Sequence, residues 1–495
     1  MSTPGARREQ HLAANRREYG DEYASLRFVE PAAAAAAMAR RAELLAELAA
    51  GAQLGCRGTK LDCRGLSPGC RLCGAGTWSC LFVNSRCNCR CFYCPAPQDE
   101  LDVPTTQTVP FATAAPYAAY VERFGFAGVS ISGGEPLLTL DRSLEYLAAV
   151  RDRSGERLHT WLYTNGTLMT PVVARRLRAA GLDEIRFDIS ACGYDLRGVA
   201  AAAGIVPIVT VEIPAIPEDA ALLRARLPAL IALGVAHLNL HQLRLTPHNL
   251  PRLRARGYTF LHGPRVTVME SELTALEVMA HVCAERLALP VNYCSFAYKS
   301  RYQAAASRQR YGTICRKPYE ELTANGYIRR LRVRGPAALL RQQAAALAAR
   351  AAAAPQAHGA AAGETPPAPD RGAPWELSPD GTELRLPLAL ATGLRWADCR
   401  LAVEYAAAHL VPRLSYLHPF TEVRLDSDTT LYVERRAAPV GLDLGPAEAS
   451  AFVAALAAVA GADPAAAAPA AGEAAPALRP VAEYEFIEAG LPEYC

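Results

Sequence analysis

Lysine is scarce in this chain, because arginine supplies 49 of its 52 basic residues. The net charge of +3 is too small to favour a nucleic acid or an anionic membrane as a partner. No uncharged apolar run of about 18 residues occurs, so we expect no membrane span. Residues 1–22 are polar and arginine-rich and lack the apolar core of a signal peptide. These absences favour a cytoplasmic protein.

Cysteine is the exception in an otherwise ordinary globular composition, with 51% hydrophobic and 20% charged residues. Nine of the 15 cysteines fall between Cys56 and Cys94. Secreted disulfide scaffolds are usually short, whereas these 495 residues leave room for two or three domains. We therefore expect metal-bound thiolates in a reducing compartment rather than disulfides.

The most informative motif is C-x3-C-x2-C, formed by Cys87, Cys91 and Cys94. Three thiolates at this spacing can surround one four-iron cluster, which normally takes four cysteines. The remaining iron would then have an open position for a small molecule. Cys89 breaks the spacing, and we interpret it as a non-ligand.

Two further arrangements of cysteine remain open. Cys70-x2-Cys73 and Cys91-x2-Cys94, seventeen residues apart, match a zinc pattern, although this leaves Cys87 without a role. The upstream cysteines predict a second iron–sulfur or zinc centre, with free thiols in a loop as the alternative. Its candidate ligands are Cys56, Cys63, Cys70, Cys73 and Cys80.

Changes in composition divide the chain into six segments. The expected segments are a helical extension (1–55), a cysteine-rich loop (56–77), a main domain (78–330), an Ala/Pro linker (335–375), a small α+β domain (376–460) and an Ala/Pro-rich tail (461–495). In the α+β domain we expect a helix near 398–409, followed by strands at 422–425 and 430–434.

Short apolar runs alternate with amphipathic segments in the main domain, which predicts a parallel sheet of βα units. The expected strands are 80–84, 128–132, 160–164, 184–189, 206–213 and 237–243. The expected helices lie near 113–124, 139–153, 170–180, 193–203, 218–233 and 270–288.

Polar or glycine-rich residues follow these strands where each one ends. They are Gly133, Gly134, Glu135 and Pro136, then Asn165, then Asp188 and Ser190, then Glu212, and finally His241. In parallel βα barrels the site is built at the carboxyl ends of the strands. We therefore expect these residues to lie around the cysteine motif, although His241 can equally be a strand-end residue.

The cysteine motif, Tyr93 before its last cysteine, and the loop Gly133–Pro136 resemble the radical S-adenosylmethionine (SAM) superfamily. The resemblance covers about residues 78–300. It implies an α/β fold with a partial (β/α)6 TIM-like barrel, here with a cysteine-rich N-terminal extension and a small C-terminal α+β domain. It also implies that the amino and carboxylate groups of SAM bind the open iron of a 4Fe–4S cluster.

The resemblance implies cofactor contacts for the strand-end residues. Glu135 would accept a hydrogen bond from the SAM ammonium group, and Tyr93 would lie near the adenine. Asn165, Asp188 or Ser190 would bind the ribose or the carboxylate, and Glu212 and His241 are further cofactor candidates. In many members the serine and aspartate of the fourth strand stand in the opposite order.

Reductive cleavage of SAM would give a 5′-deoxyadenosyl radical that abstracts hydrogen from a substrate. We hypothesise a peptide or protein substrate, recognised with help from residues 376–460, and an electron donor such as ferredoxin or flavodoxin. Alternatives are a small metabolite or RNA as substrate, activation of a glycyl-radical enzyme, or a non-catalytic zinc or iron–sulfur module. The basic and aromatic segment 298–311 is interpreted as a solvated helix face.

Overall fold

The structure is a computed structural model that describes residues 4–100, 102–353, 373–460 and 475–495. Contacts divide the chain into two units. The first comprises residues 1–304, 424–431 and 489–495, and the second comprises residues 305–423 and 432–488. Parts of the expected linker and tail, residues 354–372 and 461–474, lie outside the described residues.

A mixed eleven-stranded sheet forms the centre of the first unit, in the order β1-β2-β13-β10-β9-β8-β7-β6-β3-β4-β5. Seven neighbouring strands are parallel. They are β3 (Trp78–Phe82), β6 (Gly128–Ser132), β7 (His159–Thr164), β8 (Glu184–Phe187), β9 (Ile208–Pro214), β10 (His237–His241) and β13 (Val291–Cys294). The six predicted strands are therefore present, and β13 is a seventh that the sequence pattern missed.

The remaining strands extend this sheet at its two ends. β2 (Lys60–Cys63) is antiparallel to β13, and β1 (Gln53–Gly55) pairs with β2. β4 (Thr105–Thr106) and β5 (Val109–Pro110) extend the other end beyond β3. Since β1 and β5 are the two ends of this order, the sheet is open.

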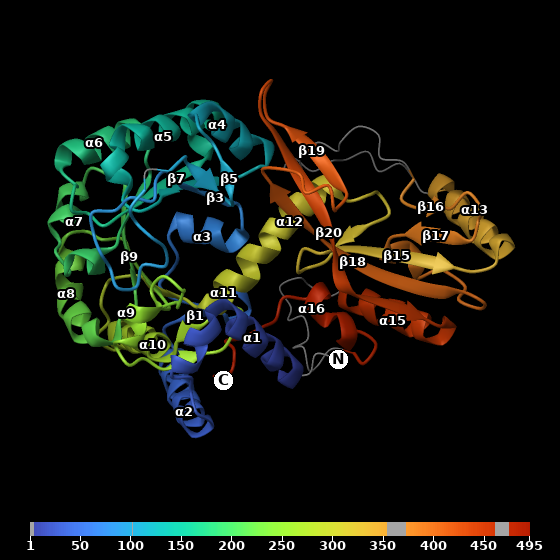
Figure 1. Cartoon of the computed structure of the whole chain (residues 1–495), viewed down its shortest axis with the longest axis horizontal. Coiled ribbons are helices and arrows are strands. Elements are labelled where there is room, and N and C mark those ends of the chain that lie inside the picture. Colours follow the sequence, from blue (N-terminus) through green and yellow to red (C-terminus); the bar gives the residue numbers. More distant parts are fainter. Residues whose placement is uncertain (1–3, 101, 354–372, 461–474) are drawn as a thin grey trace. The chain divides into compact units, whose positions relative to one another are not determined.

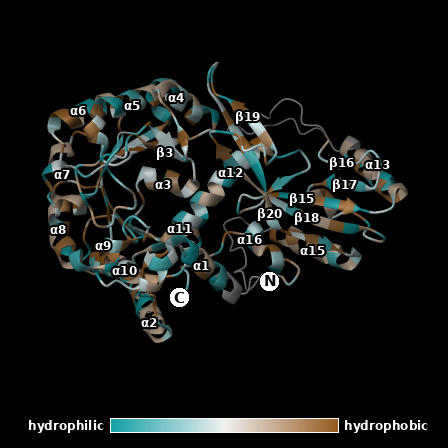
Figure 2. Cartoon of the chain, viewed as in Figure 1, coloured by the Kyte–Doolittle hydropathy of each residue, from teal (hydrophilic) through white to brown (hydrophobic). Residues whose placement is uncertain are grey.

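Helices between the parallel strands follow an arc around the sheet in Figure 1. They are α4 (Ala114–Arg123), α5 (Leu140–Ser154), α6 (Pro171–Ala179), α7 (Arg197–Ala202), α8 (Ala220–Ala232) and α10 (Met269–Ala284). Helices α5 and α6 carry both hydrophilic and hydrophobic residues, as expected of helices with one buried side (Figure 2). The predicted α/β fold, with alternating strands and helices, is confirmed.

Segment 56–77 is not the loop that the sequence suggested. It contains the fully buried strand β2 and the helix α3 (Pro68–Ala75). Ser67 caps α3 by accepting a hydrogen bond from the Cys70 amide, and Gly76 ends the helix in a left-handed conformation. Helix α3 lies inside the arc of helices and contacts β3 and β7 (Figure 1).

The predicted helical extension consists of α1 (Pro4–Tyr19) and α2 (Pro31–Leu48), joined through the 3₁₀ helix η1 (Gly20–Ser25). A two-stranded sheet of β11 (Phe260–Leu261) and β12 (Thr267–Val268) follows the short helix α9 (Leu250–Arg254). No helix among the described residues is long and apolar enough to cross a membrane.

The second unit is an antiparallel sheet with helices. Its strand order is β16 (Glu376–Leu377), β17 (Glu383–Leu386), β15 (Ile328–Arg334), β18 (Arg400–Val411), β20 (Thr430–Leu444) and β19 (Phe420–Arg424), and β14 (Glu321–Leu322) pairs with β15. The other helices are α13 (Ala337–Ala353), α14 (Leu388–Ala391), α15 (Pro446–Ala460) and α16 (Ala482–Glu485). Leu347 of α13 and Phe452 of α15 share one apolar core with Leu331 of β15.

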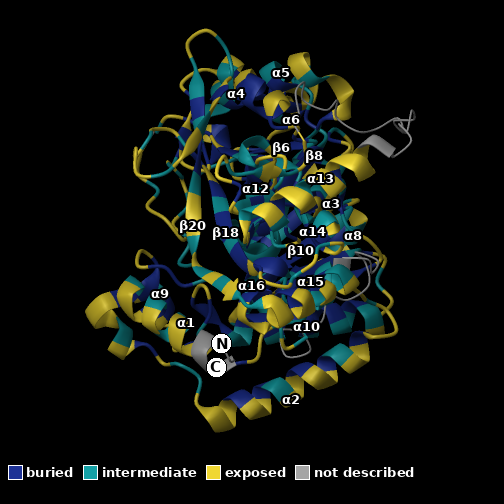
Figure 3. Ribbon diagram, turned by 90° about the vertical axis from the view of Figure 1, so that its right-hand side faces the viewer, coloured by how far each residue is buried: buried dark blue, intermediate teal, exposed yellow. Residues whose placement is uncertain are grey.

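The predicted helix at 398–409 is wrong, because this segment is the strand β18. Its alanine content favours a helix locally. Pairing with both β15 and β20, together with burial of most of its residues (Figure 3), overrides that preference. The second unit also begins at residue 305, earlier than the expected boundary at 330.

Candidate functional site

The cysteine loop begins at the end of β3 and packs directly against the Gly-Gly-Glu-Pro loop. The Gly134 amide donates to the Asn84 carbonyl and the Glu135 amide to the Arg86 carbonyl, both at 2.8 Å. A Cβ on Gly133 would lie 2.3 Å from the Asn84 oxygen, and one on Gly134 would lie 2.2 Å from the Arg86 oxygen. In this structure the two glycines are therefore needed for contact with the cysteine loop.

Gly134→Ala is expected to displace the cysteine loop, because a methyl group would collide with backbone that cannot rotate away. We expect destabilisation of about 1–3 kcal/mol and a several-fold loss of bound iron. Iron per chain after anoxic preparation measures the effect. Gly445→Ala is the control, since its nearest neighbour would be a side-chain oxygen at 3.6 Å. Equal iron content in both variants would contradict this role of Gly134.

Glu135 is fully buried, and its carboxylate faces the protein rather than open space. It accepts hydrogen bonds from the amides of Leu137 and Asn165 and from the Thr164 hydroxyl, at 2.8–3.0 Å. Burial raises the pKa of Glu135, and these three donors oppose the rise. In this structure the Glu135 carboxylate has protein donors as partners, and its expected contact with the SAM ammonium group stays a prediction. Glu135 ties its loop to the end of β7, while Pro136 begins the following 3₁₀ turn.

Asn165 connects the end of β7 to the cysteine loop. Its amide nitrogen lies 2.8 Å from the Asn88 side-chain oxygen and 3.7 Å from the Cys87 sulfur. The Asn88 amide in turn donates to the Thr167 hydroxyl at 2.7 Å. These contacts fix the first half of the loop, although ribose or carboxylate binding was the expected role of Asn165.

Tyr93, Asp188 and Ser190 form one hydrogen-bonded group beside the cysteine loop. The hydroxyls of Tyr93 and Ser190 donate to the Asp188 carboxylate at 2.9 and 2.5 Å, and the two hydroxyl oxygens are 2.7 Å apart. Burial raises the pKa of Asp188, and these donors oppose the rise. Through these hydrogen bonds, Asp188 and Ser190 at the end of β8 hold Tyr93, the residue directly before Cys94.

Residues after β10 hold the cysteine loop from a further side. Thr246 donates to the Pro95 carbonyl, and Asn249 donates to the Tyr93 carbonyl, both at 3.0 Å. Arg252 donates to the Cys91 carbonyl at 3.2 Å, and the Arg256 guanidinium lies 3.6 Å from the centre of the Phe92 ring. Sequence reasoning missed these residues, although a polar Thr246–Asn249 stretch just beyond a strand end was an available signal.

The motif cysteines have no disulfide partners, and burial raises the pKa of Cys91 to about 12 and also raises that of Cys94. A bound metal would deprotonate them outright. Among the described residues, no three cysteine, histidine or carboxylate groups converge as ligands of one metal ion would. The loop has the donors for a metal cluster, with Cys89 placed so that its amide donates to the Cys87 sulfur at 3.4 Å.

Two predicted cofactor residues, Glu212 and His241, lie on β9 and β10 in a different polar group. Arg186 of β8 donates to Glu184 at 2.8 Å and to Glu212 at 2.6 Å, and Asn239 donates to Glu212 at 3.0 Å. His241 is half-buried, and desolvation of its ring lowers its pKa to about 3; its buried Nδ1 has no hydrogen-bond partner among the described residues. Glu212 is thus a partner of Arg186 rather than a free carboxylate.

The predicted second-centre cysteines do not all lie together. Cys63 lies 3.3 Å from Cys283 of α10, sulfur to sulfur. Cys80 is half-buried on β3 and hydrogen-bonds to serines of β6, and desolvation raises its pKa to about 11. Three others, Cys56, Cys70 and Cys73, lie near β13 and the segment after it.

The interpretation of segment 298–311 as a solvated helix face is wrong. Tyr298 ends the short helix α11 (Phe296–Tyr298) and is fully buried, and Tyr311 of α12 (Ala304–Cys315) is 2% exposed. Between these helices, η7 (Lys299–Gln303) is a π-helical turn, which is frequent at functional sites.

Comparisons with known proteins match the part of the chain that carries the cysteine loop. Residues 81–203 match the Radical SAM superfamily. The chain is 28% identical over 271 residues to a Methanocaldococcus jannaschii protein named as a glycyl-radical enzyme activating enzyme, covering 52% of this chain and 71% of that protein. It is 35% identical over 111 residues to the GTP 3′,8-cyclase of Corynebacterium glutamicum, covering 22% and 29%. The chain thus spans less than a third of that cyclase.

Solved structures give only remote similarity. The Streptococcus suis protein SuiB bound to its precursor peptide SuiA is 12% identical with a TM-score of 0.32, covering 44% of this chain and 49% of SuiB. A score this low supports no further conclusion.

The chain contains a radical SAM domain, since residues 81–203 match that superfamily and include the cysteine loop and the ends of β6, β7 and β8 around it. It is an enzyme of that class, and the cofactors of the class are a 4Fe–4S cluster and SAM. The residues present fit the cluster, because three free thiols on one anchored loop supply the soft ligands that iron–sulfur clusters take.

Proposed function

We propose that this chain binds a 4Fe–4S cluster through Cys87, Cys91 and Cys94, cleaves SAM reductively and removes a hydrogen atom from a peptide or protein. The observation that carries the proposal is the fixing of the cysteine loop by residues from the ends of β6, β7, β8 and β10. The loop is thus held at the carboxyl ends of parallel strands, which is where βα folds build their sites.

When bound, the cluster supplies an electron that breaks the sulfonium bond of SAM, and the released 5′-deoxyadenosyl group takes a substrate hydrogen. The chain's own residues hold the cysteine loop in place and orient SAM. Asn165 and the Tyr93–Asp188–Ser190 group fix the loop, and the carbonyls and amides of the Gly133–Pro136 loop are the proposed contacts of the methionine part of SAM. We propose Asn165, Asp188 and Ser190 as polar groups near the ribose.

The finer fold assignment is also part of this proposal. We take the open sheet of seven parallel strands as the partial barrel of the superfamily. The segment 56–77 is then its cysteine-rich extension, and the second unit is its C-terminal α+β domain.

A protein or peptide substrate is supported by the Methanocaldococcus jannaschii relative, whose name describes activation of another enzyme and which matches half of this chain. Activation of a glycyl-radical enzyme is the second candidate for the same reason. Ferredoxin or flavodoxin is the proposed electron donor. A reducing cytosol is the proposed compartment, because all 15 cysteines are free thiols.

The proposal is tested with anoxically prepared enzyme, reduced flavodoxin and SAM. Methionine and 5′-deoxyadenosine are expected in equal amounts, and their yield should rise several-fold when the true substrate is added. Fractionated peptides and proteins are compared with a metabolite pool of the same cells. Stimulation only by the metabolite fraction would contradict a peptide substrate, and absence of 5′-deoxyadenosine with a loaded cluster would contradict the whole proposal. A glycyl radical signal in a stimulating protein would select the second candidate.

A further inference from the structure

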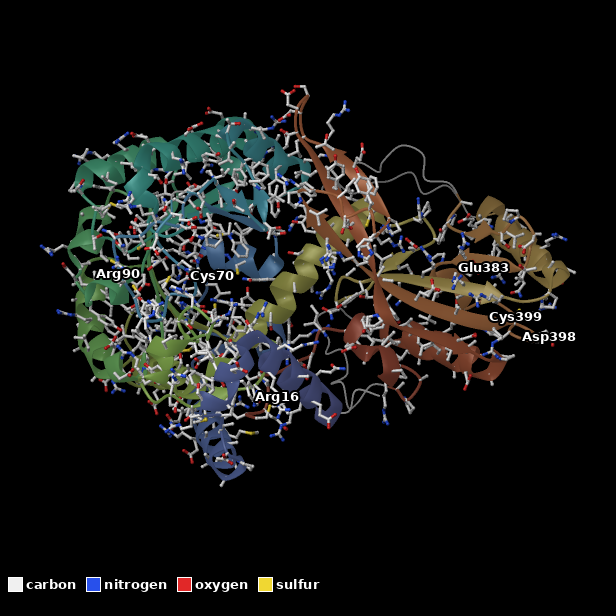
Figure 4. The ribbon with its side chains drawn as sticks, viewed as in Figure 1. Arg16, Cys70, Arg90, Glu383, Asp398 and Cys399 are labelled. Atoms are coloured by element: carbon white, nitrogen blue, oxygen red, sulfur yellow. The ribbon has the colours of Figure 1, made fainter. Side chains whose placement is uncertain are left out.

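A second group of cysteines lies away from the cysteine loop and comes from three elements. Cys56 begins the 3₁₀ turn after β1, Cys70 and Cys73 are on α3, and Cys294 is the last residue of β13. Figure 4 labels Cys70 on α3, inside the arc of helices. A Cβ on Gly74 would lie 3.9 Å from the Cys56 sulfur, so Cys56 adjoins the end of α3. The sequence pattern did not include Cys294, because it is 221 positions beyond Cys73.

Lys60 is the cation of this group and is only 1% exposed. Its ammonium nitrogen lies 2.6 Å from the Cys294 sulfur, 2.9 Å from the Asn292 side-chain oxygen and 4.7 Å from the centre of the Tyr298 ring. None of these contacts is a carboxylate. An isolated buried ammonium costs several kcal/mol unless it is paired with an anion. The surrounding thiols are the groups that can become that anion.

Lys60 is also unusual because lysine is rare in this chain. Three lysines stand against 49 arginines, so a lysine at a buried position departs from the habit of this chain. An ammonium is a compact point charge, whereas a guanidinium needs planar, forked partners. One partner, the Cys294 sulfur at 2.6 Å from the Lys60 nitrogen, suits an ammonium better than a guanidinium.

Hydrogen-bond donors also point at the sulfur atoms. The Tyr298 hydroxyl and the Gln303 amide lie 3.3 and 3.2 Å from the Cys73 sulfur, and the Asn239 amide lies 3.3 Å from the Cys70 sulfur. A neutral thiol is a weak acceptor, so three neutral donors and a cation around three sulfurs match thiolates better than thiols. Hydrogen bonds to ligand sulfurs are also how proteins tune iron–sulfur clusters.

We propose that Cys56, Cys70, Cys73 and Cys294 bind a second metal centre held by four thiolates, with Lys60 as its buried counter-ion. Four thiolates around a zinc ion or a four-iron cube leave a net negative charge, which the Lys60 ammonium partly offsets. Cys63 and Cys80 are not ligands, since Cys63 contacts Cys283 and Cys80 contacts serines.

The sulfurs of this group do not converge on one point in the part of the chain that the structure describes. The same holds for Cys87, Cys91 and Cys94, so this observation does not separate the two sites. A four-iron cube also spreads its ligand sulfurs more widely than a single ion does. The same four thiolates can therefore bind either an iron–sulfur cluster or a zinc ion. Analysis of iron, sulfide and zinc distinguishes the two.

The test uses the full chain with Cys87, Cys91 and Cys94 all replaced by alanine, prepared anoxically. The first cluster is then absent, so failure of the radical SAM proposal cannot affect the result. We expect this triple variant to retain about four irons with sulfide, or about one zinc, per chain. A triple variant free of both metals would overturn the second centre.

Ligand assignment is tested by adding Cys73→Ser or Cys294→Ser to the triple variant, with Cys283→Ser as the matched control. Each of the first two is expected to lower the remaining metal several-fold, and the control is expected to keep it. Retention in both ligand variants, or equal loss in the control, would overturn the assignment. Circular dichroism shows whether each chain is folded.

A third change addresses folding failure, because it leaves every sulfur in place. Lys60→Met in the triple variant keeps the side-chain length and removes the charge. We expect lower metal affinity, seen as several-fold faster loss of metal to a chelator, and a more negative midpoint potential if the metal is iron. Lys60→Arg should restore the potential at least in part. An unchanged rate and an unchanged potential in Lys60→Met would overturn the counter-ion role.

Discussion

Replacing Cys91 by alanine is expected to remove about four irons per chain, together with the brown colour that this cluster contributes and all cleavage of SAM. Two remaining thiolates cannot hold a four-iron cube, and the hydrogen bond from Arg252 to the Cys91 carbonyl holds this part of the loop in place. Iron and sulfide analysis, the visible spectrum and the yield of 5′-deoxyadenosine measure the loss. SAM cleavage should fall below detection, a decrease of at least about 10³-fold, because an electron has no path without the cluster.

Cys89→Ala is the matched control, because Cys89 lies in the same loop and outside the C-x3-C-x2-C spacing. We expect it to keep its iron and its activity. Loss of the cluster in Cys89→Ala with retention in Cys87→Ala would reverse the assignment of ligands.

The largest effect on stability is expected for Arg186→Leu. The guanidinium is 3% exposed and contacts Glu184, Glu212 and the Ser67 hydroxyl that caps α3. Removing one partner of a buried ionic group leaves uncompensated charge, which costs about 3–5 kcal/mol. The melting temperature of the first unit should fall by about 10 °C, as differential scanning calorimetry can measure.

Arg197→Leu is the control for that change, since Arg197 pairs with Asp195 at 91% side-chain exposure and should not alter the melting temperature measurably. The pH dependence adds a second readout. Burial alone would raise the pKa of Glu184, but Arg186 and His159 outweigh it and hold the pKa below its usual range. The stability from this carboxylate is therefore present above about pH 4.3 and is lost as pH falls through the lowered value. Arg186→Leu should show a shallower acid dependence, and an identical profile would contradict the network.

Local sequence patterns predicted the strand and helix order of the first unit well, because βα units are formed by near neighbours with clear periodicity. The strand at 128–132 coincides with β6, and the other five predicted strands differ by one or two residues at their ends. The failures were at segments whose structure depends on distant partners. β18 is alanine-rich yet lies between two strands, and β2 pairs with β13, which is more than 200 residues away.

The candidate site shows the same division. Motif spacing and strand-end positions predicted which residues surround the cysteine loop, and the structure places Tyr93, Asn165, Asp188 and Ser190 there. Sequence reasoning missed Asn249, Arg252 and the place of Lys60 beside Cys294, because these contacts join segments more than 150 residues apart. The direction in which the Glu135 carboxylate points was also beyond reach, since it depends on donors from the next strand.

The packing of two glycines under the cysteine loop bears on how the enzyme matures. Small zinc domains are unfolded until their ion arrives, because nothing else orders their ligands. Here hydrogen bonds connect the cysteine loop to residues at four strand ends. We therefore expect the polypeptide to fold before the cluster is bound. Insertion of iron and sulfide would then follow folding. A folded chain that has lost its cluster to oxygen would be expected to bind a new one.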